Sequence, residues 1–206
     1  MPCKKLTPLP DLQRIFGSRT KTLEILFLLE GAKEVVRQGF YEHELPLVEQ
    51  FCKEKKLFLV KSPFKVVLDD QQYSNSGALV RIDNPQGMYW VYVSKDEKTV
   101  LLASYYETTN NHQELGRLLG YPECCIRFFC EHFSSQNKNP EIPSTNPFTN
   151  LSQRDQDLVL ISHFPCAADC KGSITIGQKN LEMIRRYDQQ LAEHYIQSLS
   201  KRGDYP

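Results

Sequence analysis

The sequence lacks the features that mark several common classes of protein. Its 25 Lys and Arg residues are balanced by 25 Asp and Glu residues, so the formal net charge is zero. No excess charge therefore attracts the chain to nucleic acid or to an anionic membrane. Apolar runs such as ILFLL at residues 25–29 are too short to cross a bilayer, which takes about 20 apolar residues. We expect a cytoplasmic protein that has no membrane partner, and the zero net charge disfavours nucleic acid as a partner without excluding it.

Motifs of the common cofactor-dependent enzymes are also absent. The sequence contains no Gly-rich phosphate loop, no H-E-x-x-H helix and no G-x-S-x-G elbow. It has seven cysteines, an odd number, in a chain of 206 residues that can build a core without disulfides. In a reducing cytosol, clustered thiols are more often metal ligands or reactive groups than disulfides.

Hydrophobic periodicity predicts an α+β fold with a helical N-terminal region, a small antiparallel sheet and C-terminal helices that carry the cysteines. Apolar residues recur at helical spacing before Gly17 and again over residues 23–36, where Gly31 interrupts the segment, and over residues 45–52. Runs rich in β-branched and aromatic residues then predict strands, at 57–60, 65–70, 78–83 and 88–94. The turn sequence DNPQG predicts that the last two runs pair as a hairpin. Residues 98–109 fit either a strand or a helix, and we favour a helix.

The second half of the chain shows clearer helix boundaries. Asn111 followed by Glu114 resembles a capping box, and the apolar face that follows ends at Gly120. Pro122 suits the first turn of a second helix. Residues 134–156 are polar and proline-containing, which predicts a long, flexible surface loop. Ser173 could cap one long final helix.

We expect one domain over residues 1–206. Within it, residues 1–110 form a scaffold of helices and a sheet, and residues 111–206 form the region that carries the cysteine motifs.

The cysteines divide into two groups. Cys52 and Cys130 lie on the apolar stripes of predicted helices, and we predict that both are buried in the core. Cys3 has no nearby partner in the sequence. The other four fall in two short motifs, GYPECC and SHFPCAADC, as Cys124, Cys125, Cys166 and Cys170.

These two motifs contain enough ligands for a metal. His163 precedes Cys166 in an H-x-x-C-x-x-x-C pattern that ends at Cys170. Thiolates and imidazole are the ligands of zinc and iron–sulfur centres, so His163 joins the four cysteines as a candidate ligand. Zinc is slightly favoured, because one histidine with three cysteines is a common zinc set. We predict that the two motifs converge, with sulfurs closer than about 10 Å.

The adjacent cysteines limit how the site can be built. Both thiols can hardly reach one tetrahedral ion without strain, so either one binds while its neighbour does chemistry, or both serve a cluster. Cys124 and Cys125 fall in the first turn of a predicted helix, where the macrodipole lowers the pKa of a thiol. If the site is catalytic, Cys125 and Asp169 are the candidate nucleophile and base.

A purely structural interpretation stays open. The two adjacent cysteines could be small apolar filler between helices, and His163 could be a satisfied core histidine. Glu123 could hydrogen-bond to a metal ligand or act as a base, but it is also a residue that a helix N-terminus favours.

With LGRLLGYPECCIRFF and SHFPCAADCKGS in view, the chain resembles an uncharacterised family of archaeal and bacterial proteins. That family shares a GYP-x-CC motif followed by H-x-PC-x-x-DC. The first motif corresponds here to residues 120–125 and the second to His163, Pro165, Cys166, Asp169 and Cys170. The resemblance covers residues 114–177 and implies that the two motifs form one site. It implies no reaction.

The leading hypothesis is a metal-binding protein, and within that class a metal- or cluster-dependent enzyme with zinc or an iron–sulfur cluster. The sequence does not indicate whether its substrate is a small molecule or a protein. Two alternatives remain. A structural zinc module for partner binding has four protein ligands, and a metal-free vicinal-dithiol protein performs redox or sulfur-transfer chemistry.

Overall fold

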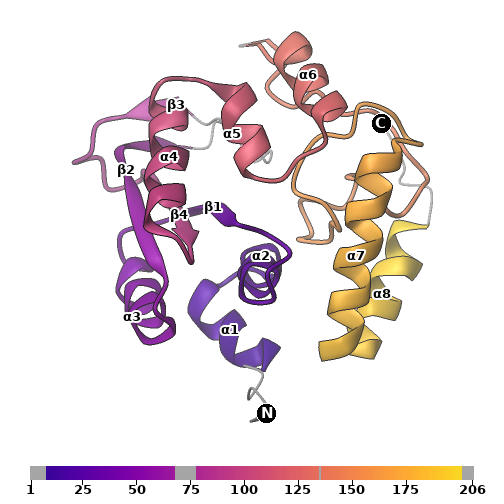
Figure 1. Ribbon diagram of the computed structural model, residues 1–206, viewed down its shortest axis with the longest axis horizontal. Coiled ribbons are helices and arrows are strands. Elements are labelled where there is room, and N and C mark those ends of the chain that lie inside the picture. The colour runs from indigo at the N-terminus through magenta and orange to yellow at the C-terminus, as the bar shows by residue number, and fades with distance from the viewer. Residues whose placement is uncertain (1–7, 68–77, 135, 201–206) are drawn as a thin grey trace.

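The computed structural model describes residues 8–67, 78–134 and 136–200. Within these residues, eight helices accompany one four-stranded antiparallel sheet, which confirms the α+β class (Figure 1). The elements in chain order are α1 (Leu9–Phe16), α2 (Arg19–Leu29), β1 (Val35–Phe40), α3 (Leu45–Lys55), β2 (Phe58–Val67), β3 (Ala78–Val80), β4 (Met88–Ser94), α4 (Glu97–Thr108), α5 (His112–Leu118), α6 (Glu123–His132), α7 (Lys171–Tyr187) and α8 (Gln189–Leu199).

The sheet has the strand order β1-β4-β2-β3, with antiparallel neighbours throughout. β3 pairs with β2 and not with β4, so the predicted hairpin between the last two strands is wrong. β3 and β4 are both antiparallel to β2, so they run parallel to each other with β2 between them, and the segment that connects them is a crossover and not a hairpin turn. Residues 68–70, at the end of the second predicted run, lie outside the described residues.

The first strand is a second departure from the sequence prediction. The apolar pattern that predicts a helix through residue 36 continues from α2 into β1. The helix ends at Leu29, and Gly31 then adopts a φ of +80° that only glycine accepts readily. Val35 therefore begins a strand that pairs with β4, where its β-branched side chain is favoured.

Both faces of the sheet are covered, and β4 shows this best because it is buried along its whole length. Val91 and Val93 pack with α1, α2 and α3, whereas Trp90 and Tyr92 on the opposite face pack with α4 and α5. Successive side chains of a strand point to opposite faces, so a strand buried on both sides becomes continuously apolar.

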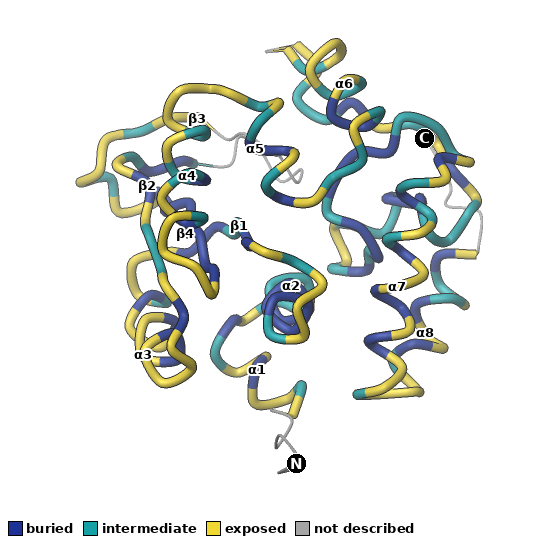
Figure 2. The backbone as a smooth tube through the Cα atoms, in the orientation of Figure 1, coloured by how far each residue is buried: buried dark blue, intermediate teal, exposed yellow. Residues whose placement is uncertain are grey.

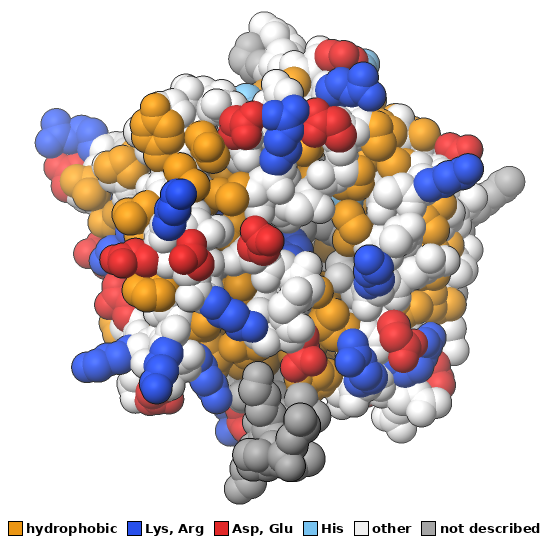
Figure 3. Space-filling view, in the orientation of Figure 1, with side chains coloured by type: hydrophobic (Ala, Val, Ile, Leu, Met, Phe, Trp, Pro, Cys, Tyr) orange, Lys and Arg blue, Asp and Glu red, His pale blue; other side chains and the backbone are white. Residues whose placement is uncertain are grey.

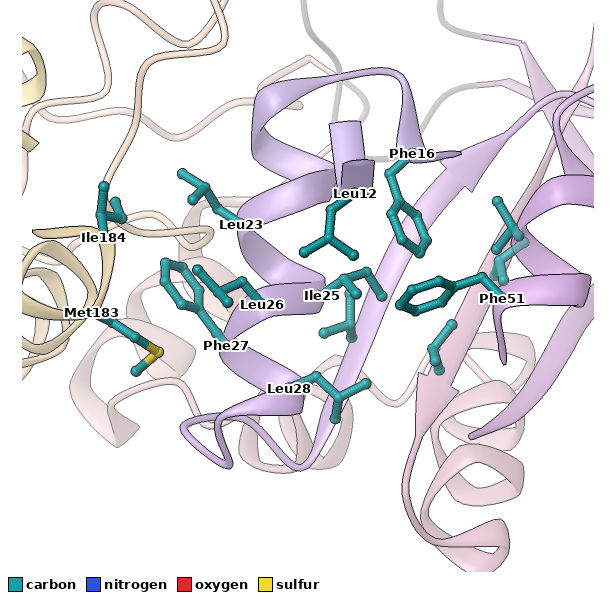
Figure 4. Close-up of a cluster of buried hydrophobic side chains, with 14 of the residues drawn as sticks. Leu12, Phe16, Leu23, Ile25, Leu26, Phe27, Leu28, Phe51, Met183 and Ile184 are labelled. Atoms are coloured by element: carbon teal, nitrogen blue, oxygen red, sulfur yellow. The ribbon is translucent and has the colours of Figure 1, made fainter. Parts of the chain in front are cut away.

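Helix α2 joins the two halves of the molecule, which explains why residues 22–28 are buried all round it. Figure 4 shows Ile25 directed toward Phe51 of α3, and Phe27 directed the other way, toward Met183 and Ile184 of α7. A helix that is apolar on all sides belongs in the interior of a protein. The sheet and the C-terminal helices therefore share one hydrophobic core.

The C-terminal helices differ in one respect from the prediction. The expected single final helix is divided into α7 and α8, because Asp188 is extended and its side chain caps α8 by accepting from the Leu191 N–H at 2.9 Å. Cys170, not Ser173, occupies the N-cap position of α7. The favoured helix over residues 98–109 is confirmed as α4.

The segment predicted as a long loop contains neither helix nor strand in its described residues, which exclude residue 135. Thr149, Asn150 and Leu151 in its second half are nevertheless buried, contrary to the predicted surface location. Thr149 donates to the Ala168 carbonyl at 2.7 Å, and the Asn150 amide donates to the Leu199 carbonyl at 2.8 Å. Figure 2 shows the resulting burial around the start of α7. The flexibility of this segment stays a prediction.

The surface agrees with the balanced composition. Acidic and basic side chains are interspersed over the face shown in Figure 3. Hydrophobic side chains gather there over α4, on which Leu101 and Tyr105 are exposed. Among the described residues, no helix combines the length and apolar character that a membrane span needs.

Candidate metal centre

Four cysteine sulfurs from the two sequence motifs lie together at the junction of α6 and α7. Cys124, Cys125, Cys166 and Cys170 each place Sγ within 4.8 Å of the other three. The Sγ atoms of Cys124 and Cys125 are 3.9 Å apart, and that of Cys170 lies 3.6 Å and 3.5 Å from them, respectively. The two motifs converge as predicted, although about forty residues separate them in the chain.

The turn between α5 and α6 positions the adjacent cysteines. Gly120, with a φ of +77°, ends α5, and the N–H groups of Gly120 and Tyr121 donate back to the carbonyls of Arg117 and Gly116 at 3.0 Å. This double hydrogen bond is a Schellman motif. It turns the chain so that Pro122 caps α6 and the two cysteines occupy its first turn.

A close helix contact positions Cys170. Gly172, in the first turn of α7, lies so near Pro122 that a Cβ at this glycine would be 2.9 Å from the proline Cβ. The absence of a side chain therefore allows the start of α7 to approach the start of α6. In addition, the Cys166 N–H donates to the Cys125 sulfur at 3.4 Å, which draws the second motif against the first.

His163 lies beside the sulfur group but does not join it. It is buried, and its Nε2 is 2.8 Å from the Ser173 hydroxyl oxygen, which is itself 3.2 Å from the Cys125 sulfur. The imidazole is thus linked to the sulfur group through Ser173. Burial, with the nearby positive charge of Lys33, lowers the pKa of His163 to about 3, so the imidazole is neutral at physiological pH.

The thiols differ in acidity. Burial raises the pKa of Cys125 well above its ordinary value and raises the pKa of Cys166 to about 11. Burial acts on Cys170 in the same direction, but hydrogen bonds from Ser173 and the neighbouring thiols lower the pKa of Cys170 to about 6. Cys170 is therefore the most acidic of these three thiols.

The carboxylates near the motifs lie away from the sulfurs. Asp169 is exposed and falls outside the sulfur group. Glu123 is also exposed, and it accepts two hydrogen bonds from Arg117, at 3.0 Å and 2.7 Å. This pair joins α5 to the first turn of α6, so Glu123 has a structural role in holding the two helices together.

Two residues outside the motifs differ from their sequence interpretation or were missed. Cys130 is exposed, so its predicted burial is wrong, whereas Cys52 is buried as predicted. Helical spacing aligned Cys130 with Ile126, but α6 is buried only in its first turn and extends beyond the surface on which it packs (Figure 2). Ser173 was predicted only as a cap, and its hydroxyl contacts were missed because nothing local marks them. Cys3 lies outside the described residues.

A pocket of about 350 Å³ opens beside the sulfur group. Cys125, His163, Arg37 and Glu107 are among the residues that line it. The remaining walls are mostly aromatic and aliphatic. The sulfur group and this pocket are therefore neighbours that share the Cys125 side chain.

Comparison with known proteins gives one match, and it lies over this region. Residues 99–195 match the model of a family described as "Protein of unknown function (DUF483)". The match includes both cysteine motifs, and it confirms the resemblance to an uncharacterised family. No curated protein and no solved structure matches the chain.

Proposed function

We propose that the protein binds a single zinc ion through the four clustered cysteine sulfurs. The observation that supports this proposal is the spacing of the sulfurs, which is 3.5–3.9 Å among Cys124, Cys125 and Cys170, with the Cys166 sulfur within 4.8 Å of each. Four sulfurs at about 2.3 Å from one tetrahedral ion are about 3.8 Å from one another. Thiolates that bind different irons of a cluster stand farther apart. The geometry therefore favours one ion over a cluster.

The adjacent cysteines both belong to this proposed ligand set. Their sulfurs lie 3.9 Å apart, so the steric argument that only one of them can reach a tetrahedral ion does not hold for this backbone. Cys125 is then a ligand and not a nucleophile, and His163 supports the set through Ser173. A partner of this kind orients a metal ligand.

Four protein ligands leave no open position for water or substrate, which is the property of a structural zinc site. The ion would join the first turns of α6 and α7 and fix one end of the neighbouring pocket. We therefore place the zinc in a structural role and assign ligand binding to the pocket. Catalysis at the metal, with Asp169 as base, has no support from the position of that exposed carboxylate.

Metal analysis tests this proposal. Protein purified without oxygen should contain one zinc per chain, and cobalt in its place should give the visible spectrum of a tetrahedral thiolate site. Cys124→Ser and Cys125→Ser should each lower zinc content. Cys130→Ser is the matched control, because this exposed cysteine lies on the same helix, and it should leave zinc content unchanged.

The alternatives predict different results. Iron with acid-labile sulfide would replace the single ion by a cluster. Metal-free protein that forms a disulfide on mild oxidation would favour thiol chemistry, for which the 3.5 Å separation of the Cys125 and Cys170 sulfurs is suitable. Either result would overturn the zinc proposal.

A further inference from the structure

The pocket beside the metal centre has the size and composition of a small-molecule site. Its volume of about 350 Å³ falls within the range of natural ligand pockets. One wall is the face of the sheet that carries Trp90, and the opposite wall is formed by α5 and α6. Figure 1 shows α4 and α5 beside this part of the sheet.

The polar end of the pocket is an ion pair between two strongly buried side chains. Arg37 on β1 and Glu107 on α4 are 14% and 12% exposed, and two guanidinium nitrogens of Arg37 donate to the two carboxylate oxygens. The Tyr92 hydroxyl donates to the same carboxylate at 3.2 Å. The guanidinium carbon lies 3.7 Å from the centroid of the Trp90 ring, so the plane of the cation is supported by an aromatic face.

This ion pair determines the charge that a ligand can carry. The paired charges of Arg37 and Glu107 sum to zero, and burial lowers the pKa of the pocket residue His112, which keeps that imidazole neutral. An isolated charge placed among the apolar walls would lose its hydration without gaining a counterion. The pocket therefore favours an uncharged ligand.

The same pair determines where a ligand can form hydrogen bonds. A carboxylate has about four acceptor sites, and a guanidinium offers only donors. A molecule that carries a neighbouring N–H and C=O matches both groups at once, because its N–H can donate to Glu107 while its C=O accepts from Arg37. Burying this N–H and C=O edge of a ligand without hydrogen-bond partners would be unfavourable.

The apolar walls determine the shape. Phe129 and Phe164 line the pocket with their rings nearly parallel, at an interplanar angle of 7° and a centroid distance of 6.0 Å. Trp90 and Tyr121 contribute further aromatic surface. Flat rings gain most from such walls, because aromatic pairs prefer offset stacking or edge-to-face contact.

We propose that this pocket binds a flat, uncharged heteroaromatic molecule of two or three fused rings that presents a neighbouring N–H and C=O to Glu107 and Arg37. The proposal goes beyond metal binding and does not depend on which metal the cysteines hold. It requires only the pocket and its ion pair.

Matched probes test the proposal on the metal-loaded wild-type protein. Quinolin-2(1H)-one carries the N–H and C=O edge on two fused rings, N-methylquinolin-2-one has the same rings without the donor, and naphthalene-2-carboxylate replaces the edge by a negative charge. Trp90 is the only tryptophan of the chain, so its indole N–H resonance reports on the pocket wall in a nuclear magnetic resonance titration.

Quinolin-2(1H)-one should shift the Trp90 resonance and bind at least tenfold more tightly than the other two probes. Equal binding of the N-methyl compound would show that the pocket binds by apolar contact alone, without the proposed hydrogen bonds. Tighter binding of the carboxylate would show that the pocket is an anion site. Either result overturns the proposal, as does the absence of any Trp90 shift at millimolar probe concentration.

A variant pair then assigns the effect to the carboxylate. Glu107→Gln should remove the preference for the lactam over its N-methyl derivative. Glu49→Gln is the control, since it removes the carboxylate of an exposed pair with Lys61 and should leave binding unchanged. A lactam preference that survives in folded Glu107→Gln protein would contradict the assigned role. If this variant does not fold, the comparison of the three probes on the wild-type protein still decides the proposal.

Discussion

Replacing Gly172 by alanine should weaken the metal centre, although the same change stabilises most helices. Glycine in a helix costs up to about 1 kcal/mol relative to alanine, so propensity alone predicts a more stable protein. At this position, however, the added Cβ would lie 2.9 Å from Cβ and 3.0 Å from Cγ of Pro122. The two atoms belong to a rigid ring at the start of α6. The ring cannot rotate away as a flexible side chain does.

The size of the effect follows from these distances. Non-bonded carbon atoms are most favourable at about 3.5–4.0 Å, so α6 and α7 must separate by at least about 0.5 Å. Metal–ligand distances in a formed site vary by only about 0.2 Å. Overpacking costs about 1–3 kcal/mol, which exceeds the gain in helix propensity. If the metal-free protein relaxes this strain, zinc affinity should fall roughly tenfold.

The assay is zinc affinity by chelator competition, measured together with thermal unfolding of the zinc-loaded protein. Gly177→Ala is the matched control on the same helix. Its Cβ would lie 3.0 Å from Phe148 Cβ and backbone oxygen, away from the sulfurs, so it should lower stability and leave zinc affinity unchanged. A Gly172→Ala protein with a higher unfolding temperature and unaltered zinc affinity would refute the reasoning.

Three further outcomes are expected. Zinc binds thiolates, and burial raises the pKa of Cys125 and Cys166, so zinc binding at pH 7 should release at least two protons and should weaken as the pH falls. Calorimetry in buffers of different ionisation enthalpy measures the released protons, and a binding heat that is the same in every buffer would contradict this prediction. Cys52→Ala should lower the free energy of unfolding by about 1–3 kcal/mol in urea without changing zinc content, because this thiol is buried in the core. Lys33→Met should lower the free energy of unfolding by about 3–5 kcal/mol, because it leaves Glu24 buried and unpaired. The double variant with Glu24→Leu should regain at least half of that free energy in urea unfolding. Equal stability of the single and double variants would exclude this explanation.

Local sequence chemistry was sufficient to predict part of this structure. The Asn111 side chain accepts from the Glu114 N–H at 3.2 Å, and Gly120 ends the helix in the left-handed conformation, as their spacing predicted. Caps can be predicted because the residues that form them are neighbours in the chain. The convergence of the two cysteine motifs was predictable for another reason. Several cysteines grouped in two short motifs indicate that their thiols belong to one site.

The remaining features depend on contacts between distant segments. The order of the strands places β2 between β3 and β4, and no local turn signal encodes that insertion. The exposure of Cys130 depends on how much of α6 meets the rest of the protein. The adjacent sulfurs of Cys124 and Cys125 can face one point because of the backbone conformation at the start of α6, which their sequence spacing did not reveal.

The pocket is assembled from two parts of the chain with different relationships to other proteins. The cysteine motifs, Glu107 and the α5 and α6 wall fall inside residues 99–195, the segment that matches the uncharacterised family. Arg37 and Trp90, which form the opposite wall, precede that segment. On the proposed assignments, the four cysteines and the residues of the sheet wall are separate parts of the chain. A protein that carries both cysteine motifs but has other residues at the positions of Arg37 and Trp90 is therefore expected to bind a different ligand in this pocket.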